Sequence, residues 1–379
     1  MTATNPLEAP TVIPRLTPFS NPRTALVHYW LVSMRGGERV LERMLGLYPG
    51  ADIFTHVYEP EKMSRRINAA TVETSFIDRL PFSKKLYQYY LPLMPSALEE
   101  LDLTPYDLVI SSEAGPAKGV ITRPDALHVC YCHSPMRYLW DQYHQYRAAA
   151  GLLPRLAMPF MYHRLRQWDV SSSTRVDRFA ANSRYIGQRI RKVWRREAEV
   201  IHPPVETDLY APVDNPGDTY LWVGQFVPYK RPDLAVDAFN ASGRKLLMVG
   251  TGGMAKELRA RAKGNITIVD RLDFTALRRA FAEARALLMT AEEDFGITPV
   301  ESMASGRPVV AFGRGGALDT VLPEETGMFF TEQTPESLNE ALDAFEAFLP
   351  HFSPDDAVAQ AQNFAPEIFD RKLRALTSL

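Results

Sequence analysis

The chain has 379 residues, a length typical of two or three domains. Its 46% hydrophobic and 23% charged residues exclude a disordered or fibrous protein, and a net charge of -2 gives no general attraction to nucleic acid. Two cysteines cannot build a disulfide framework, and no apolar run reaches the roughly 18 residues of a membrane span. The first residues lack the layout of a signal peptide, so we expect a cytoplasmic protein.

The first half of the chain has the pattern of a parallel sheet covered by helices. Residues 1–22 are rich in proline and small polar residues, which predicts a flexible tail. Between residues 23 and 205, short apolar runs alternate with amphipathic segments. Strands are predicted at 25–29, 106–111, 126–132 and 178–182, and a helix at 38–48.

The same alternation is clearer in residues 206–360, after a proline-rich connector around 203–216. Strands are predicted at 220–224, 245–250, 265–269, 286–290, 308–312 and 328–330, with helices that begin at Pro232, Met254, Thr275, Pro299 and Ala317. Residues 361–379 are predicted as a helical segment that packs back on the N-terminal domain. We therefore expect an α/β protein with two Rossmann-like parallel-sheet domains, whose ligands bind outside the carboxyl ends of the strands.

Two loops between a strand and a helix are suited to an anion. Gly36 and Gly37 open the first helix, where backbone N–H groups can approach a phosphate, although a tight turn without a ligand is the simpler interpretation. Lys230 and Arg231 directly precede a helix, where cations oppose the helix dipole unless an anion is bound. This favours Lys230 as a diphosphate contact, the alternative being two cations that point into water.

A third loop imitates a dinucleotide-binding fingerprint. Gly250-Thr251-Gly252-Gly253 follows a strand, and Asp270 lies twenty positions after Gly250. The strand is not the first of its domain, and alanine stands at position 255 where the fingerprint has glycine. An NAD-dependent oxidoreductase is therefore kept as a rival interpretation.

Glu293 and Glu301 stand eight positions apart in a segment that runs from a strand through an acidic loop into a helix. Glu301 has a structural explanation, because residues 298–301 match a capping box with Thr298 as the N-cap. Glu293 has none, since clustered carboxylates at 292–294 are costly unless a ligand or a cation offsets their charge. We interpret Glu293 as a contact to a polyhydroxylated ligand.

Cys130, Cys132 and His133 are close in sequence but do not predict a metal site. On a strand the two cysteines share a face and His133 points the other way, and the chain has no further cysteine. At the end of a strand, His133 is either a proton or hydroxyl partner or a satisfied interior histidine.

Taken in order, these loops resemble those of the retaining nucleotide-sugar glycosyltransferases of family 4, which have the GT-B fold. The resemblance rests on Glu293-x7-Glu301 with its continuation to Gly315-Gly316, on residues 36–40 and on residues 132–135, and it extends from residue 24 to the end. It implies that Glu293 lies by the donor sugar, that Glu301 holds the ribose and that His133 touches the transferred sugar. It also implies donor contacts from the residues Gly36, Gly37, Lys230, Phe295, Gly296 and Ile297.

One position departs from the family pattern. Gln225 stands where the family often has an arginine, so one of two phosphate cations is missing and Arg231 is a candidate substitute. The family needs no Asp-x-Asp metal motif and none is apparent, so we expect neither a metal nor a resident cofactor. The resemblance implies that Glu293, His133 and Lys230 carry the catalysis.

Residues 133–141 and 227–233 are most similar to bacterial mannosyltransferases of exopolysaccharide assembly. This similarity implies GDP-mannose as donor and a polyprenyl-diphosphate-linked oligosaccharide as acceptor. Another nucleotide-sugar donor or a soluble acceptor is the alternative. A nucleic-acid-binding protein, suggested by the basic run at residues 184–196, is disfavoured by the overall acidity.

A lipid-linked acceptor requires contact with the inner face of the cytoplasmic membrane. Two segments mix apolar and basic residues as interfacial helices do, at 82–93 and 152–168. The residues concerned are Phe82, Leu86, Tyr87, Tyr90, Leu91 and Leu93 with Lys84 and Lys85, and Leu153, Met158, Phe160, Met161 and Tyr162 with Arg155, Arg164 and Arg166. Core helices with charged edges are the alternative for either segment alone. We expect peripheral membrane binding.

Overall fold

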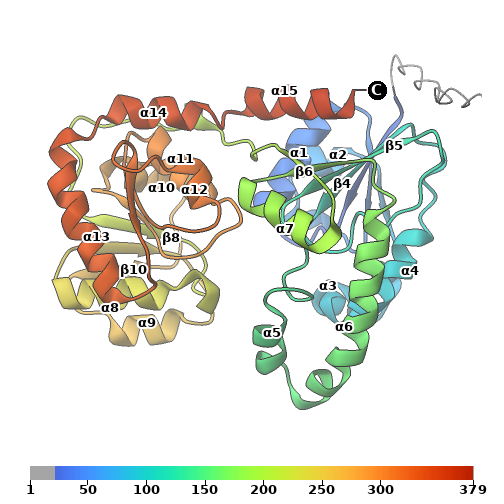
Figure 1. The fold of residues 1–379 in the computed structure, drawn as a ribbon, viewed down its shortest axis with the longest axis horizontal. Coiled ribbons are helices and arrows are strands. Elements are labelled where there is room, and N and C mark those ends of the chain that lie inside the picture. Colours follow the sequence, from blue (N-terminus) through green and yellow to red (C-terminus); the bar gives the residue numbers. More distant parts are fainter. Residues whose placement is uncertain (1–21, 379) are drawn as a thin grey trace, which may run out of the picture.

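The computed structural model describes residues 22–378, so the tail predicted at 1–22 lies outside this range except for its last residue. Two α/β domains lie side by side, and the helices α14 (Pro354–Gln362) and α15 (Pro366–Thr377) run from the second domain across to the first (Figure 1). Each domain is built on one sheet in which all strands are parallel. The prediction of two facing parallel-sheet domains is confirmed.

The first sheet has seven strands in the order β3-β2-β1-β4-β5-β6-β7. Their bounds are β1 (Thr24–His28), β2 (Asp52–Thr55), β3 (Val72–Thr74), β4 (Leu108–Glu113), β5 (Leu127–Cys132), β6 (Arg178–Ala181) and β7 (Glu199–Val200). Its central strands are buried on both faces, which explains why they read as continuous apolar runs. The edge strands β3 and β7, and β2 beside β3, were not expected from the sequence.

Helices cover both faces of this sheet. The helices α1 (Gly36–Leu47), α2 (Arg65–Ala69) and α15 pack on one face, while α4 (Met94–Glu99), α6 (Leu152–Ser173) and α7 (Arg184–Trp194) cover the other. The shorter elements are η1 (Pro60–Lys62), η2 (Phe76–Arg79), α3 (Ser83–Leu86), η3 (Tyr87–Leu93) and α5 (Tyr143–Ala149). The C-terminal segment therefore completes the core of the N-terminal domain, with Phe369 and Leu373 fully buried.

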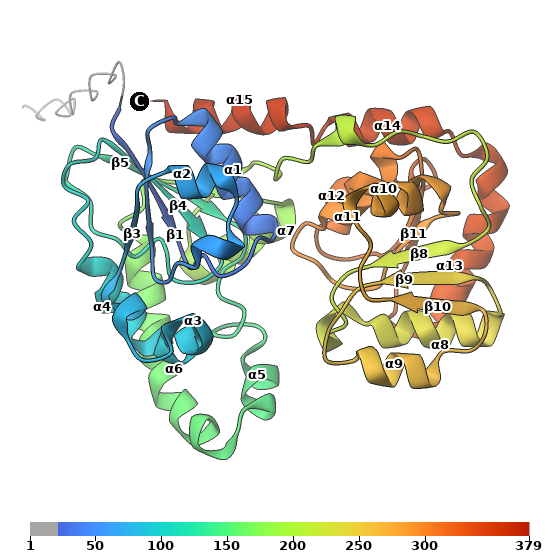
Figure 2. The ribbon, with the colours of Figure 1, turned by 180° about the vertical axis from the view of Figure 1, so that it is seen from behind.

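The second sheet has six strands in the order β10-β9-β8-β11-β12-β13. Their bounds are β8 (Tyr220–Val223), β9 (Leu246–Val249), β10 (Ile266–Val269), β11 (Leu287–Met289), β12 (Val309–Phe312) and β13 (Gly327–Phe330). One face carries α8 (Pro232–Ser242), α9 (Ala255–Arg261) and α13 (Pro335–Phe348), and the other carries α10 (Phe274–Glu283), α11 (Ile297–Ala304), α12 (Ala317–Thr320) and α14 (Figure 2). The 3-10 turns are η4 (Thr207–Leu209), η5 (Pro228–Lys230) and η6 (Leu349–His351).

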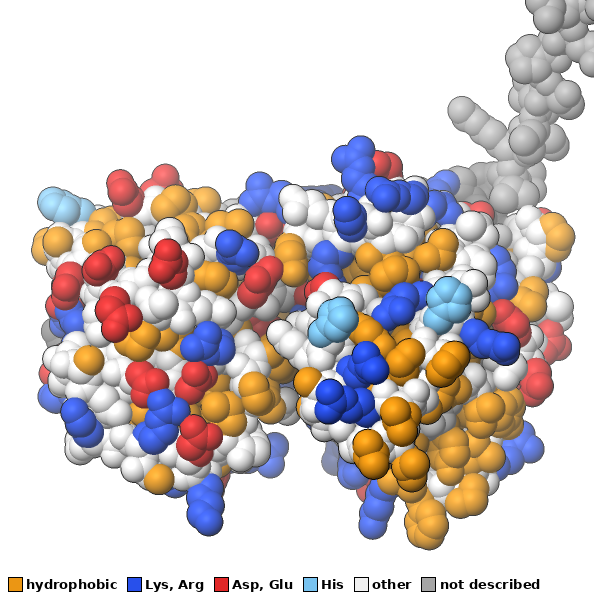
Figure 3. Space-filling view, turned by 60° about the horizontal axis from the view of Figure 1, so that its bottom comes forward, with side chains coloured by type: hydrophobic (Ala, Val, Ile, Leu, Met, Phe, Trp, Pro, Cys, Tyr) orange, Lys and Arg blue, Asp and Glu red, His pale blue; other side chains and the backbone are white. Residues whose placement is uncertain are grey.

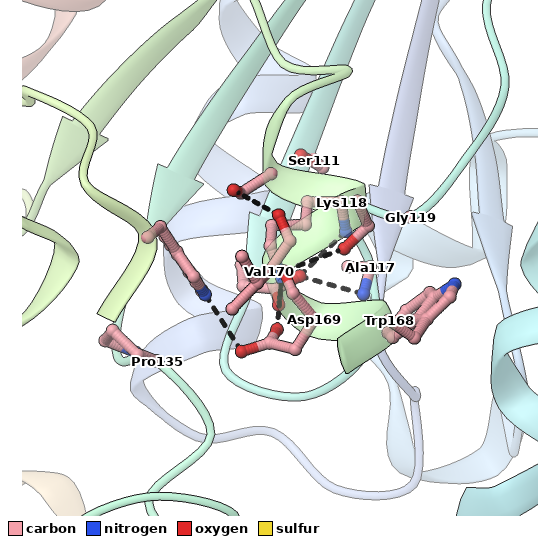
Figure 4. Close-up of polar contacts among 12 residues, drawn as sticks. Ser111, Ala117, Lys118, Gly119, Pro135, Trp168, Asp169 and Val170 are labelled. Atoms are coloured by element: carbon pink, nitrogen blue, oxygen red, sulfur yellow. Dashed lines mark hydrogen bonds and ion pairs between the residues drawn. The ribbon is translucent and has the colours of Figure 1, made fainter. Parts of the chain in front are cut away.

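A buried ionic network braces the N-terminal domain. The Lys118 ammonium lies between the carboxylates of Glu113, at 3.1 Å, and Asp169, and all three side chains are fully buried (Figure 4). The indole of Trp194 donates to Asp169 at 2.9 Å and its ring lies 4.2 Å from the Lys118 nitrogen. Burial disfavours the charged amine, but the two carboxylates outweigh burial and raise the pKa of Lys118. The network ties β4, α6 and α7 together.

None of the helices within residues 22–378 is both long enough and apolar enough to cross a bilayer. The longest, α6, projects below the N-terminal domain together with α5 (Figure 1).

Candidate functional site

A cleft of about 1370 Å³ lies between the two domains. It is lined by the loops that follow β1 and β5 of the first sheet and β8, β9, β10 and β11 of the second. In both sheets the strand order reverses direction beside the first strand, between β1 and β4 and between β8 and β11. The cleft thus occupies the place where doubly wound sheets bind their ligands.

The N-terminal domain contributes the beginning of α1. Gly36 and Gly37 line the cleft, and a Cβ on Gly37 would lie 2.5 Å from the Tyr29 hydroxyl oxygen, so a larger residue there would have to displace the Tyr29 side chain. The backbone N–H of Arg35 donates to the Glu38 carboxylate at 2.9 Å, which closes the first turn of the helix. Backbone N–H groups therefore face the cleft from this side.

His133 also lines the cleft, at the end of β5. Its Nε2 lies 2.9 Å from the Ser112 hydroxyl, which lies 3.0 Å from Nδ1 of the buried His28. Burial, with a smaller contribution from His28, lowers the pKa of His133 to about 3. The imidazole is consequently neutral at physiological pH and can exchange hydrogen bonds with a sugar hydroxyl, as the resemblance implied.

On the opposite wall, the Lys230 ammonium lies 2.5 Å from the Glu293 carboxylate. The Thr290 hydroxyl donates to the Lys230 carbonyl at 2.8 Å and accepts from the Trp222 indole at 3.0 Å, which fixes η5 against β11. Burial opposes the charge on Lys230, but Glu293 outweighs burial and raises the pKa of the amine. The expectation that Glu293 lacks a structural partner is therefore wrong: the two predicted catalytic residues hold each other.

The neighbouring carboxylates are also paired. Asp294 accepts from Arg137 and from Arg189 of the N-terminal domain. Burial, and after it the neighbouring Glu292, raises the pKa of Tyr185 in α7 to about 12. Cations of the protein therefore offset much of the charge of this acidic loop, and sequence reasoning had not identified Arg137 or Tyr185.

The loop ends at Gly296, whose φ of +83° favours glycine, and α11 begins at Ile297. Phe295, Gly296 and Ile297 all line the cleft, and their contact with a donor stays a prediction. The predicted capping box is wrong, because Gly296 and not Thr298 occupies the N-cap position. The first turn of α11 therefore keeps N–H groups without a side-chain cap, a favourable place for an anion.

Glu301 instead contacts the connector between the domains. Its carboxylate accepts from the Tyr210 hydroxyl at 2.8 Å. Burial raises the pKa of Glu301, while Tyr210 and the charge of Arg39 act against that rise. Tyr210 was missed because nothing in the spacing of the sequence links residue 210 to residue 301.

Arg231, the candidate for the second phosphate cation, has a carboxylate partner of its own. Gln225 and Lys230 line the cleft, but Arg231 is absent from the described residues of its wall. The Arg231 guanidinium lies 3.2 Å from Asp233, two residues along the chain. Arg231 is thus held by Asp233 outside the cleft wall of the described residues, and its substitution for the missing arginine stays a prediction.

Three other arginines line the cleft: Arg35, Arg39 and Arg271. Arg35 and Arg39 flank the glycine turn, and Arg271 follows the end of β10. Their positions beside predicted ligand loops were the signal that could have identified them.

The glycines behind the rival oxidoreductase interpretation have a packing role. A Cβ on Gly250 would lie 1.8 Å from the Gly224 carbonyl oxygen, and one on Gly252 would lie 2.4 Å from the Phe226 carbonyl oxygen. These glycines allow close contact between the loops that follow β8 and β9. Asp270, the acidic residue of the imitated fingerprint, lies 2.6 Å from the Arg259 guanidinium. The loop follows the second strand of the domain, whereas the fingerprint follows the first. In residues 22–378, no group of three or more His, Cys, Asp or Glu side chains could hold a metal ion.

Comparisons with known proteins agree with this geometry. Residues 34–209 match the family described as Glycosyltransferase Family 4, and residues 217–345 match Glycosyl transferases group 1. An uncharacterized glycosyltransferase of Methanocaldococcus jannaschii is 26% identical over 182 residues, 45% of this chain and 50% of that protein. The GDP-Man:Man(3)GlcNAc(2)-PP-Dol alpha-1,2-mannosyltransferase of Xenopus laevis is 25% identical over 279 residues, 62% of this chain and 56% of that protein. The chain thus spans about half the length of these curated relatives.

Solved structures share the fold over nearly the whole chain. HepE of Anabaena in complex with UDP-glucose has a TM-score of 0.67 at 16% identity, covering 93% of this chain and 98% of that one. Sucrose-phosphate synthase from Thermosynechococcus elongatus has a TM-score of 0.67 at 18% identity, with the same coverage. The fold is GT-B, and together with the two family matches it supports a GT-B glycosyltransferase.

Proposed function

We propose that this protein is a retaining glycosyltransferase that transfers mannose from GDP-mannose to a polyprenyl-diphosphate-linked oligosaccharide in the synthesis of a bacterial exopolysaccharide or surface polysaccharide. The observation that carries the proposal is the Lys230–Glu293 pair in the cleft that His133 and the uncapped start of α11 also line. A cation, a carboxylate and free backbone N–H groups together suit a substrate that joins a sugar to a diphosphate.

The leaving diphosphate explains the cation and the amides. When the bond from the anomeric carbon to the phosphate oxygen breaks, negative charge grows on the diphosphate. The Lys230 ammonium, kept charged by Glu293, and the N–H groups of α11 and α1 are fixed by the fold before the reaction. Such groups stabilise the charge without reorganising, which is the largest contribution to catalysis in many enzymes.

The carboxylates of the acidic loop favour front-face displacement over a covalent intermediate. Glu293 is engaged by Lys230, and Asp294 by Arg137 and Arg189, so neither is an unpaired nucleophile. The acceptor hydroxyl bonds to the anomeric carbon on the face that the diphosphate leaves, and its proton passes to a leaving-group oxygen. The configuration of the sugar is then retained, and the charge of Glu293 stabilises the oxocarbenium-like transition state.

The identity of the donor is supported by the similarity of residues 133–141 and 227–233 to mannosyltransferases and by the alignment with the Xenopus laevis mannosyltransferase. A UDP-sugar is the second candidate, because HepE, which shares the fold, was solved with UDP-glucose. A lipid-linked acceptor places the enzyme peripherally on the inner face of the cytoplasmic membrane.

A nucleotide panel tests this proposal. GDP, UDP and NAD are added separately, and thermal unfolding is followed; a ligand at one hundred times its Kd stabilises by about 2.7 kcal/mol. We expect stabilisation by GDP, and release of GDP from GDP-mannose when a polyprenyl-diphosphate oligosaccharide is supplied. NMR of the product should show that the anomeric configuration of the donor is kept. Stabilisation by NAD alone, or an inverted product, would contradict the proposal.

A further inference from the structure

The N-terminal half of α6 exposes an apolar stripe. Leu152, Leu153, Leu156 and Phe160 fall within an arc of roughly 100° on the helix. Leu153 and Phe160 are each 79% exposed and Leu152 is 74% exposed. Met158 and Leu165, on the opposite side of the helix, are buried. The helix is therefore apolar on two faces, and only one of them is covered by the protein.

A second segment extends this apolar surface. Phe82 and Tyr89 are 75% and 71% exposed in the α3–η3 region, and Tyr146 of α5 is also exposed. The α3–η3 region and α6 pack on one shared core cluster beneath these residues. We call the exposed set the apolar tip: Phe82, Tyr89, Tyr146, Leu152, Leu153, Leu156 and Phe160. Figure 3 shows hydrophobic side chains gathered with Lys and Arg at the lower end of this domain.

The charge of the two segments has one sign. Neither residues 79–98 nor residues 143–168 contain Asp or Glu, although the whole chain has a net charge of -2. The basic residues in these ranges are Arg79, Lys84, Lys85, Arg147, Arg155, Arg164 and Arg166. On the helix, Arg155 and Arg164 border the apolar stripe on its two sides. A surface that is apolar at its centre and basic at its edges complements an anionic bilayer.

The structure also shows which residues of the predicted segments are not available to a bilayer. Lys84 contacts Asp78 and the Tyr58 carbonyl, and Arg166 donates to the Leu139 carbonyl. The apolar residues Leu91 and Met158, predicted to face the membrane, are buried in the core. The cations of these ranges that stay exposed are Arg79, Lys85, Arg155 and Arg164, and the last three are taken for the test below.

We propose that the apolar tip inserts into the headgroup layer of a bilayer that contains anionic lipid, with Lys85, Arg155 and Arg164 contacting the lipid phosphates. The assignment rests on the proposed function, because a lipid-linked acceptor brings the enzyme to such a surface. The chain supplies the connection: residues 134–142 lead directly from His133 in the cleft to α5. We therefore expect docking through the tip to turn the N-terminal domain, with its side of the cleft, toward the membrane.

Vesicle sedimentation of the full chain tests the surface. The probes are vesicles of phosphatidylcholine alone and of phosphatidylcholine mixed with phosphatidylglycerol. The apolar variant is Leu153→Ser with Phe160→Ser, and the charge variant replaces Lys85, Arg155 and Arg164 by Gln. The matched control is Leu318→Ser, a side chain 48% exposed on the other domain. All of these side chains are at the surface, and thermal unfolding verifies that each variant folds.

We expect the wild type to bind anionic vesicles and the control to match it. The apolar variant should bind at least about tenfold more weakly, since two large apolar side chains no longer leave water. At low salt the affinity of the charge variant for anionic vesicles should fall about fivefold for each cation removed. Its binding should also depend less on the salt concentration than that of the wild type.

Equal binding of anionic vesicles by the wild type and the apolar variant would overturn the proposal. Equal sedimentation of the wild type with neutral and with anionic vesicles would also overturn it. Light scattering tests the other possible partner of the tip, a second copy of this chain. If the apolar variant dissociates a dimer and leaves vesicle binding unchanged, the tip is an interface between copies of this chain. The nucleotide panel without vesicles separates the two proposals. If nucleotides stabilise the protein but vesicles do not bind it, only the proposal of membrane binding by the apolar tip is overturned. If vesicles bind it but no nucleotide stabilises it, the proposed glycosyltransferase activity is overturned.

Discussion

The contact between Lys230 and Glu293 allows a double-mutant cycle on the proposed reaction, with Lys230→Met and Glu293→Gln made singly and together. Their side chains are only 23% and 17% exposed, so water screens the pair weakly. Loss of Lys230 removes one fixed cation, which typically lowers kcat by about 10²–10³. It also leaves the Glu293 charge unpaired where a diphosphate should bind. Adding Glu293→Gln removes that repulsion, so the double variant should bind nucleotide more tightly than Lys230→Met.

The assay needs two readouts. Calorimetric titration with GDP and UDP reports nucleotide binding, and single-turnover transfer from GDP-mannose reports chemistry. Groups in direct contact commonly show coupling energies of about 0.5–3 kcal/mol. Arg231→Gln is the matched control, because Arg231 is the adjacent cation but pairs with Asp233 and does not contribute to the wall of the cleft in residues 22–378. Its kcat and Kd should stay within about twofold of the wild type.

Two results would refute this reasoning. Strictly additive effects of the Lys230 and Glu293 changes would show that the contact has no role in the binding of the diphosphate. A loss on Arg231→Gln as large as that on Lys230→Met would show that the cation was assigned to the wrong residue.

Three further predictions follow from the buried polar groups. Lys118→Met should lower the free energy of unfolding by about 3–5 kcal/mol in urea titration, since it leaves two buried carboxylates without a cation; an unchanged midpoint would contradict this. Burial lowers the pKa of His56 to about 3 and of His128 to about 4, so the unfolded chain binds more protons below pH 6.5. As the pH falls from 7.5 to 5.5, each of these two histidines should lower the free energy of unfolding by about 1.4 kcal/mol. Replacement of either histidine by Gln should make the free energy of unfolding depend less on pH. Tyr210→Phe should weaken nucleotide binding about fivefold by freeing Glu301, and calorimetry showing an unchanged Kd would exclude that positioning role.

The architecture could be predicted because each strand or helix carries its own pattern of apolar and polar residues in the sequence. Strands such as β1 and β5 are buried on both faces and therefore appear as apolar runs, while the helices keep one polar side. The reversed strand order then brings the ends of distant strands together, which is why loops chosen separately from the sequence line one cleft. The strands β2 (DIFT) and β3 (VET) were missed because both are short and carry polar residues, so neither appears as an apolar run.

The errors in the site come from tertiary contacts. Residues 298–301 have the composition of a capping box, but α11 begins earlier, after Gly296. Gly296 has a positive φ, and a Cβ at this position would lie 2.8 Å from Met289. Pro299 is tolerated there because the first turn of a helix needs no N–H from it. Likewise the partners of Glu293 and Glu301 lie 63 and 91 residues away, so their pairing depends on the packed loops and leaves no periodic trace in the sequence.

The acidic loop joins the two proposals physically. Asp294, one residue after Glu293, is held by Arg137 and Arg189 of the N-terminal domain, and the Ser183 hydroxyl donates to the Asp294 carbonyl at 2.5 Å. Arg137 belongs to residues 134–142, the segment that leads from the cleft to the apolar tip. The loop that carries the proposed donor carboxylate is therefore fixed from the N-terminal domain, in part by the stretch of chain that leads to the proposed membrane contact. If this domain receives the acceptor as proposed, a donor loop anchored in this way aligns the sugar relative to the acceptor, which is the alignment a two-substrate transfer requires.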